Sequence, residues 1–288
     1  MAYQGLAYQG LAYWWLAIQK HIYQIGKSNM VADLKFSANL GFLWTDRPLD
    51  AAIHAAYEAG FDAVECHWPY ETEIEAVNSA LKQTGLKMLG LNTLKGKAGE
   101  NGLLALASRE DEARQVIDQA IAYAVGTDTQ NIHTMAGFAS GQTAQDCFVN
   151  NLSYACDMAA RNNKTILIEP LNHFDAPDYF LSTTHHARDI IQQVGKNNLK
   201  LMFDCYHVQI MQGDLCRQLE ADMDIIGHIQ FASVPDRGAP DNGEVNYQYV
   251  FDHIKSLGYG QPLGAEYKPA GGDTDASLGW LAQYRPKS

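Results

Sequence analysis

The sequence predicts an α/β protein folded as one closed (β/α)8 TIM barrel, and three observations support that prediction. Eight short apolar runs typical of strands alternate along the chain with eight longer segments that have helical spacing. The length of 288 residues is typical of one such barrel. Several apolar runs end in a polar residue, and a parallel barrel gathers such residues at its carboxyl-terminal mouth.

The first 29 residues differ from everything that follows. A tandem repeat, Ala-Tyr-Gln-Gly-Leu at 2–6 and 7–11, leads into an aromatic run over 12–18. That run is too short to span a bilayer, and no basic residues precede it as in a signal peptide. We interpret 1–29 as an N-terminal extension of unknown role, either a docking aromatic helix or a non-native segment, and 30–288 as the barrel. We expect no membrane partner and a cytoplasmic location.

In the first half of the chain the predicted strands and helices alternate, and proline and glycine mark the ends of the helices. Apolar runs at 35–40, 63–67 and 86–92 have the length of strands. Helical spacing occupies 48–59, 71–84 and 110–125, with Pro48 at the first start and Gly60 and Gly85 after the first two ends. The glycine-rich loop at 96–102 is too long for a connector, so it is expected to reach over the mouth.

The second half continues the alternation. The expected strands are 131–135, 165–169, 199–204, 228–231 and 263–266. The expected helices are 144–162, one capped at Ser182 or Thr183, one from Asp214, 247–256 and 278–284. No stretch between these elements has the composition of a domain linker.

Charge and cysteine content exclude several classes of function. The net charge is −12, and every acidic residue lies after position 29, so the barrel repels polyphosphate backbones and is not expected to bind nucleic acid. The five cysteines are odd in number and contain no C-x-x-C pair. That pattern indicates reduced thiols in a cytosolic protein rather than a disulfide framework.

Four polar residues end the last four strand-like runs, about one strand–helix unit apart. They are Glu169, Asp204, Gln230 and Glu266. Three carboxylates and an amide oxygen form an all-oxygen ligand set, which favours Mg²⁺ or Mn²⁺ over zinc. Glutamates beside a carbon flanked by carbonyl and hydroxyl can also move a proton through an enediol. The alternative is that each carboxylate only pairs with a nearby cation.

Three further residues are candidates for substrate binding. His207 follows the sixth strand and could hydrogen-bond a substrate oxygen, or it is a solvent-facing loop histidine. Arg237 could hold a substrate carboxylate, or it pairs with a surface aspartate beside it. Lys268 lies near the same rim and could assist. For His67, His133 and His228, on the second, fourth and seventh strands, packing and function are both open.

At these residues the chain resembles the hydroxypyruvate isomerases of the xylose-isomerase-like barrel superfamily. The resemblance runs from about residue 36 to residue 280. The motifs that carry it are Ile-Glu-Pro-Leu-Asn at 168–172, Asp-Cys-Tyr-His at 204–207, Gly-His-Ile-Gln at 227–230, Gly-Glu-Val-Asn-Tyr at 243–247 and Gly-Ala-Glu-Tyr-Lys-Pro at 264–269.

The resemblance implies roles for the four polar residues. Glu169 and Glu266 would be the proton donor and acceptor, and all four would bind a divalent metal, Mg²⁺ or Mn²⁺. The segments at 91–93 and 235–237 look more like a sister group that isomerises 2-oxo-tetronates. Family members usually continue the arginine with His-Glu-Pro, whereas this chain has Gly-Ala-Pro at 238–240. The identity of the keto acid is therefore open.

Other functions compete with an isomerase of small anionic keto acids. A sugar 3-epimerase of the same superfamily would use two bases on opposite faces of one carbon. A non-catalytic sugar-acid binding protein would bind without turnover. A metal-dependent nuclease of the endonuclease IV kind is disfavoured by the acidic charge and the all-oxygen ligand set. Homo-oligomerisation is expected by analogy with barrels of this size.

Overall fold

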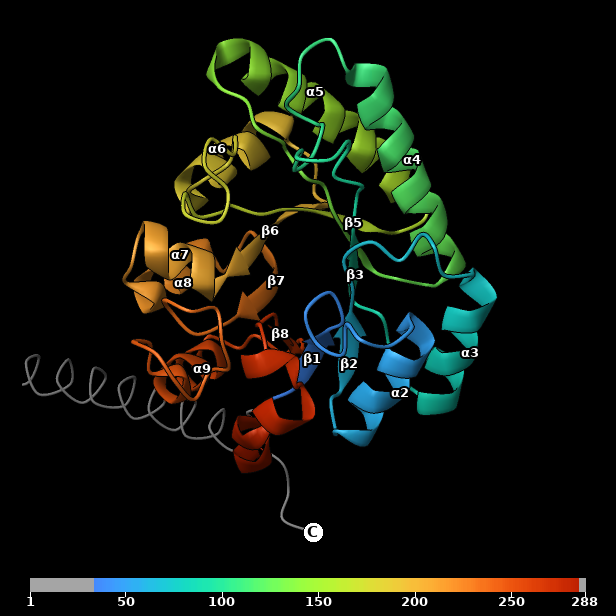
Figure 1. Cartoon of the computed structure of the whole chain (residues 1–288). Coiled ribbons are helices and arrows are strands. Elements are labelled where there is room, and N and C mark those ends of the chain that lie inside the picture. Colours follow the sequence, from blue (N-terminus) through green and yellow to red (C-terminus); the bar gives the residue numbers. More distant parts are fainter. Residues whose placement is uncertain (1–33, 285–288) are drawn as a thin grey trace, which may run out of the picture.

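The computed structural model describes residues 34–284, which form a (β/α)8 barrel (Figure 1). All paired strands are parallel, in the order β2-β1-β8-β7-β6-β5-β4-β3. The ring closes between β2 and β3, where Val64 pairs with Met88 and the Leu89 N–H donates to the Val64 carbonyl at 2.7 Å. The predicted fold class is therefore confirmed, whereas the extension at 1–29 lies outside the described residues.

The eight strands fall where the apolar runs predicted them, although several are shorter. Their bounds are β1 Phe36–Asn39, β2 Ala63–Glu65, β3 Gly90–Asn92, β4 Asn131–His133, β5 Thr165–Ile168, β6 Leu199–Asp204, β7 Ile226–Phe231 and β8 Leu263–Ala265. Parallel pairing places all their carboxyl ends at one rim. Glu169 and Glu266 each directly follow a strand, and Asp204 is the last residue of β6.

Helices surround the sheet (Figure 1). They are α2 Leu49–Glu58, α3 Ile74–Thr84, α4 Glu110–Gly126, α5 Gly141–Ala160, α6 Thr184–Val194, α7 Cys205–Met211, α8 Leu215–Asp222 and α9 Tyr247–Ser256. Three 3₁₀ turns follow β8, namely η1 Ala270–Gly272, η2 Asp275–Ser277 and η3 Gly279–Tyr284. The Thr183 hydroxyl caps α6 by accepting from the His186 N–H at 3.2 Å, as predicted.

Two elements correct the sequence-based assignment. The segment after Asp204 was expected to be a loop, but α7 begins at the next residue. Asp204 is both the last strand residue and the helix N-cap, because its Oδ1 accepts from the Tyr206 N–H at 2.9 Å. The segment expected as a final α-helix is instead the 3₁₀ helix η3, which carries the buried Trp280.

An aromatic cluster holds the C-terminal segment against the barrel wall. The Phe36 ring on β1 packs edge-on against Phe231, Phe251 and Trp280, with ring centroids 5.1–5.9 Å apart. Edge-to-face pairs of this kind stabilise by about 1 kcal/mol beyond their buried area. The cluster joins β1, β7, α9 and η3 and leaves the rim of the barrel for polar residues.

No helix within residues 34–284 is both long enough and apolar enough to cross a membrane.

The barrel interior near the mouth has no spare room at Gly264. A Cβ there would lie 2.2 Å from Oε1 of Glu65, 2.7 Å from Cγ of Gln230 and 2.9 Å from Nε2 of His228. We expect Gly264→Ala to lower the free energy of unfolding by about 1–3 kcal/mol through overpacking, measured by urea denaturation. The control is Gly260→Ala, where a Cβ meets nothing within 4 Å. Equal stabilities of the two variants would contradict this account.

Candidate active site

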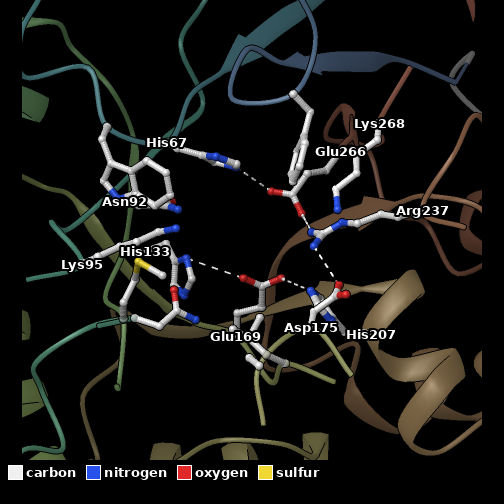
Figure 2. A pocket seen from close by; sticks show the side chains of 16 residues that line it. His67, Asn92, Lys95, His133, Glu169, Asp175, His207, Arg237, Glu266 and Lys268 are labelled. Carbon is white, nitrogen blue, oxygen red and sulfur yellow. Dashed lines mark hydrogen bonds and ion pairs between the residues drawn. The ribbon is translucent and has the colours of Figure 1, made fainter. Parts of the chain in front are cut away.

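A pocket opens at the carboxyl ends of the strands, and most of the predicted site residues line it (Figure 2). Glu169, Glu266, His207, Arg237 and Lys268 all contribute to its wall. Asp204 and Gln230 do not line it, but each is almost fully buried and contacts a lining residue, His207 for Asp204 and Glu266 for Gln230. The structure thus brings the residues named from the sequence together at one rim, and their roles stay predictions.

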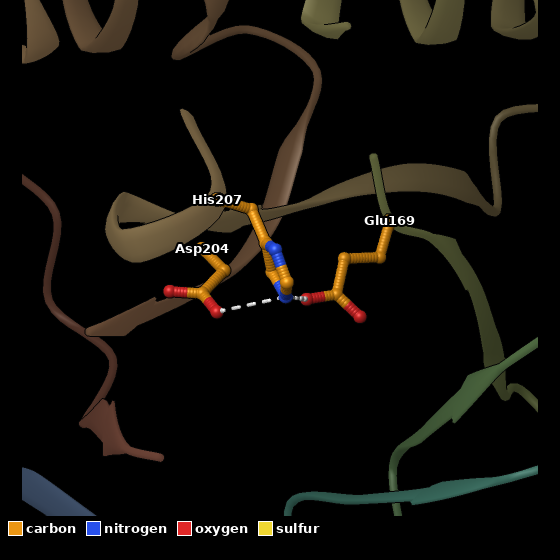
Figure 3. A group of neighbouring side chains, drawn as sticks. All are labelled: Glu169, Asp204 and His207. Carbon is orange, nitrogen blue, oxygen red and sulfur yellow. Dashed lines mark ion pairs between the residues drawn. The ribbon is translucent and has the colours of Figure 1, made fainter. Parts of the chain in front are cut away.

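Glu169, Asp204 and His207 form the tightest group of potential metal ligands (Figure 3). One donor atom of each lies within 4.8 Å of the other two. Nε2 of His207 is 3.6 Å from Asp204 Oδ2 and 3.8 Å from Glu169 Oε1. The sequence placed His207 with the substrate-binding residues, and the structure puts it beside two of the proposed ligands.

Three buried oxygen atoms of the predicted quartet have no hydrogen-bond partner among residues 34–284. They are Oε1 of Glu169, Oδ2 of Asp204 and Oε1 of Gln230. Buried oxygens left bare are costly, and a hard divalent cation is the partner that such a set accepts. The donor set therefore fits a divalent metal ion, and the choice of Mg²⁺ or Mn²⁺ stays a prediction.

The Gln230 amide is oriented by two carboxylates. Its Nε2 donates to Glu65 Oε2 and to Glu266 Oε1, both at 3.3 Å, which leaves the amide oxygen bare. Glu65 also contacts His228 Nε2 at 2.7 Å and accepts from the Ser37 hydroxyl at 3.3 Å. Glu65 was not among the predicted site residues, although it too ends an apolar strand.

Glu266 is surrounded by donors. Its Oε1 accepts from the Asn39 side chain at 2.9 Å and contacts His67 Nε2 at 3.0 Å. Its Oε2 is paired with the Arg237 guanidinium and has no second hydrogen bond in the described part of the chain. Oε2 therefore keeps a lone pair for a further ligand.

The two glutamates differ in protonation tendency. Burial raises the pKa of Glu169, and the charges of Glu266 and Asp204 raise it further. Burial alone would also raise the pKa of Glu266, but the Arg237 charge and the His67 hydrogen bond hold it below its usual range. Burial and the Glu266 charge raise the pKa of Asp204 to about 7. Carboxyl groups whose pKa values are pushed apart are typical of acid–base pairs.

The tautomer of His207 follows from its neighbours. Its Nδ1 faces the backbone N–H of Asn172 at 3.0 Å and the Asn172 side-chain nitrogen at 2.8 Å. A backbone N–H can only donate, so Nδ1 accepts and the neutral ring carries its hydrogen on Nε2. Burial, with the nearby Arg237 charge, lowers the pKa of His207 and keeps the ring neutral. The solvent-facing loop alternative is wrong, because this side chain is 2% exposed and lies on α7.

Arg237 is a mostly enclosed residue that contacts several carboxylates, with 12% of its side chain exposed. Besides Glu266 it contacts Asp204 at 3.7 Å and Asp175 at 3.3 Å. Its guanidinium lies 4.8 Å from the Phe42 ring centroid. The alternative of a surface ion pair with a neighbouring aspartate is therefore wrong, and the Arg237 Nε–H has no partner within the described residues.

The histidines left open by the sequence all face the interior. His67 contacts Glu266 and His228 contacts Glu65. Nδ1 of His133 lies 3.6 Å from Glu169 Oε2, and neither ring nitrogen has a hydrogen bond to any residue between 34 and 284. Their strand positions were visible in the sequence, but alternation alone could not show that they surround the carboxylates.

Comparisons with known proteins agree on the family. The model of the xylose isomerase-like TIM barrel family matches residues 53–284. The 2-oxo-tetronate isomerase of Cupriavidus necator is 41% identical over 87% of this chain and 98% of its own length. The hydroxypyruvate isomerase of Escherichia coli is 39% identical over 88% of this chain and its whole length. A crystal structure described as an AP endonuclease, family 2, from Brucella melitensis is 38% identical, with a TM-score of 0.84 over 88% of this chain and 99% of that one.

Burial of neutral His133 makes stability depend on pH. Burial lowers its pKa from 6.5 to about 3, so between these values the unfolded chain binds a proton that the folded chain refuses. Stability is therefore lost as the pH falls through this window. When the pH falls from 7 to 5, the free energy of unfolding should drop in the parent by about 2 kcal/mol more than in His133→Asn or His133→Gln. Urea titrations in EDTA measure this, and parallel losses in all three proteins would contradict it.

Proposed function

This chain belongs to the xylose isomerase-like TIM barrel family and is an isomerase, and we propose that its substrate is a short hydroxy-keto acid. The reaction would convert hydroxypyruvate to tartronate semialdehyde, or a 2-oxo-tetronate to the 3-oxo-tetronate. The names of relatives at about 40% identity support both substrates equally. The observation that carries the proposal is the pair of buried glutamates, Glu169 and Glu266, on facing sides of one pocket (Figure 2).

The glutamate pair would move the proton. One carboxylate removes a proton from the carbon that bears the hydroxyl, and the C–H electrons form the enediol double bond as the carbonyl oxygen is protonated. The other glutamate returns a proton to the former carbonyl carbon, while the hydroxyl on the first carbon becomes the new carbonyl by losing its proton. Glu266 is the member held ionised by Arg237 and His67, so it is the one ready to accept.

A divalent cation is the proposed cofactor. Glu169, Asp204, Gln230 and Glu266 would hold it, and three of these residues offer a bare buried oxygen. When bound, Mg²⁺ or Mn²⁺ would polarise the substrate oxygens.

His207, Arg237 and Lys268 are proposed to bind the substrate. The hydrogen on His207 Nε2 is directed toward the two proposed metal ligands, where a substrate oxygen would lie. Arg237 keeps Glu266 ionised and has its Nε–H free to donate. Lys268 is exposed at the rim, 6.0 Å from the Phe42 ring centroid.

A sugar 3-epimerase is the second candidate. Two solved 3-epimerases, each less than 25% identical to this chain, have the same fold. Likeness at this level concerns the fold and not the reaction. An epimerase would invert one carbon and leave the carbonyl where it was. NMR analysis of the products separates the two reactions, because only the isomerase moves the carbonyl.

A nuclease and a non-catalytic binding protein fit less well. The name of the Brucella melitensis structure suggests a DNA-repair enzyme. The net charge of −12 and a pocket lined by buried carboxylates oppose binding of a phosphate backbone. A binding protein would not need two glutamates with opposite pKa shifts.

Glu169→Gln keeps the size of the side chain and removes its ability to exchange a proton. We expect turnover of hydroxypyruvate to fall about 100- to 10,000-fold, while circular dichroism stays that of a folded barrel. The control is Glu58→Gln on α2, an exposed glutamate that does not line the pocket. Retained activity in Glu169→Gln would refute the assigned role.

Removal of metal should abolish turnover without unfolding the chain. We expect EDTA to stop exchange of the C3 protons of hydroxypyruvate in D₂O, and Mg²⁺ or Mn²⁺ to restore it. A readout without catalysis is the melting temperature, which Mg²⁺ should raise in the parent and not in Asp204→Asn, because a ligand that binds only the folded state stabilises it. Full exchange in EDTA, or an equal thermal shift in both proteins, would count against the metal site.

A further inference from the structure

Lys95 stands apart from the other cations of the pocket. It lies on the loop after β3, half-buried in the pocket wall, with its ammonium 4.2 Å from the centroid of the Trp68 ring. The ammonium has no hydrogen bond or ion pair with any residue from 34 to 284. Arg237, by contrast, is already engaged by three carboxylates. Lys95 is thus the most enclosed uncommitted positive charge in the pocket.

The backbone that carries Lys95 is fixed. The Trp68 indole N–H donates to the Thr93 carbonyl at 3.1 Å, and the Thr93 hydroxyl accepts from the Met135 N–H at 3.1 Å. The Gly102 N–H donates to the Lys95 carbonyl at 2.8 Å, which closes the glycine-rich loop on itself. The backbone at Lys95 is therefore already ordered before an anion binds, and the Trp68 ring gives the ammonium a contact inside the pocket.

No carboxylate within residues 34–284 pairs with the Lys95 ammonium. Partial burial lowers its pKa, because the ammonium loses part of its hydration. Contact with the aromatic ring compensates for some of the lost hydration energy, and a hydrogen bond to a carboxylate would compensate for more. Figure 2 shows Lys95 entering the pocket from the side opposite to Lys268 and Arg237. An anion at Lys95 therefore lies at the end of the pocket away from the Arg237 cluster.

We propose that Lys95, supported by the Trp68 ring, is the anchor for the substrate carboxylate, and that it makes the pocket selective for keto acids over neutral ketoses. This inference rests on the proposed isomerase function, and it specifies the orientation of the substrate in the pocket. The acid end would lie against the wall formed by the loops after β2 and β3. The reacting carbons would then extend between Glu169 and Glu266.

The test compares ligands that differ only in the carboxylate. Hydroxypyruvate and dihydroxyacetone share a hydroxymethyl ketone, and the second carries CH₂OH in place of the acid. We expect Lys95→Met to raise the KM for hydroxypyruvate on the order of 10- to 100-fold, with a smaller change in kcat and no change toward dihydroxyacetone. Lys95→Arg should recover part of the loss. The control, Lys97→Met, removes an exposed lysine of the same loop and should leave all constants unchanged.

Equilibrium binding separates this proposal from the reaction itself. Titration calorimetry with glycerate and glycerol, in Mg²⁺, uses a matched acid and alcohol that cannot isomerise. Weaker glycerate binding in Lys95→Met, with glycerol unaffected, supports the anchor even if hydroxypyruvate is not turned over, in which case only the proposed reaction fails. The anchor is overturned if Lys95→Met binds glycerate like the parent, if both ligands are lost together, or if the parent binds glycerate no better than glycerol.

Discussion

The whole site depends on the burial of four carboxylates within one barrel mouth. Glu65, Glu169, Asp204 and Glu266 are each at most 5% exposed. Desolvation and mutual repulsion make such a group costly unless every charge finds a donor, a cation or a proton. The chain meets this constraint unevenly. Glu65 has hydrogen-bond partners at both oxygens, Glu266 Oε2 has Arg237 alone, and Glu169 and Asp204 each keep one oxygen without a hydrogen bond among residues 34–284. This difference separates Glu65, a supporting carboxylate, from the three that can react or bind an ion.

The barrel makes that arrangement possible because each carboxylate lies at the end of a different strand. Parallel strands deliver side chains to one rim, and the backbone hydrogen bonds of the sheet hold them there. Arg237 then bridges carboxylates from β6, β8 and the loop after β5. Its own backbone has a φ of 53°, a conformation that non-glycine residues rarely adopt, and the loop fixes it through a 2.7 Å hydrogen bond from the Lys268 N–H.

Sequence periodicity was sufficient for the fold and for the expectation that the polar residues at the strand ends share a rim, because strand and helix alternation determines where each strand ends. It could not show that Asp204 would be strand end and helix cap at once, since the two signals overlap in one residue. Glu65 ends a strand as the predicted ligands do, yet its role emerges only from contact with Gln230. Lys95 and Trp68 were beyond sequence reasoning, because both lie on loops, after β3 and β2, and a loop has no periodicity from which to place a side chain.

The hydrogen bond between the Asn172 backbone and His207 has a consequence for how the site tolerates change. The donor that selects the imidazole tautomer is a main-chain N–H, so every residue except proline at position 172 would supply it. The path of the chain alone is thus enough to select the tautomer of the neutral histidine, and the Asn172 side-chain nitrogen at 2.8 Å adds a second contact to the same ring atom. Sequence drift in this loop can alter the shape of the pocket rim while the proton on Nε2 stays in place.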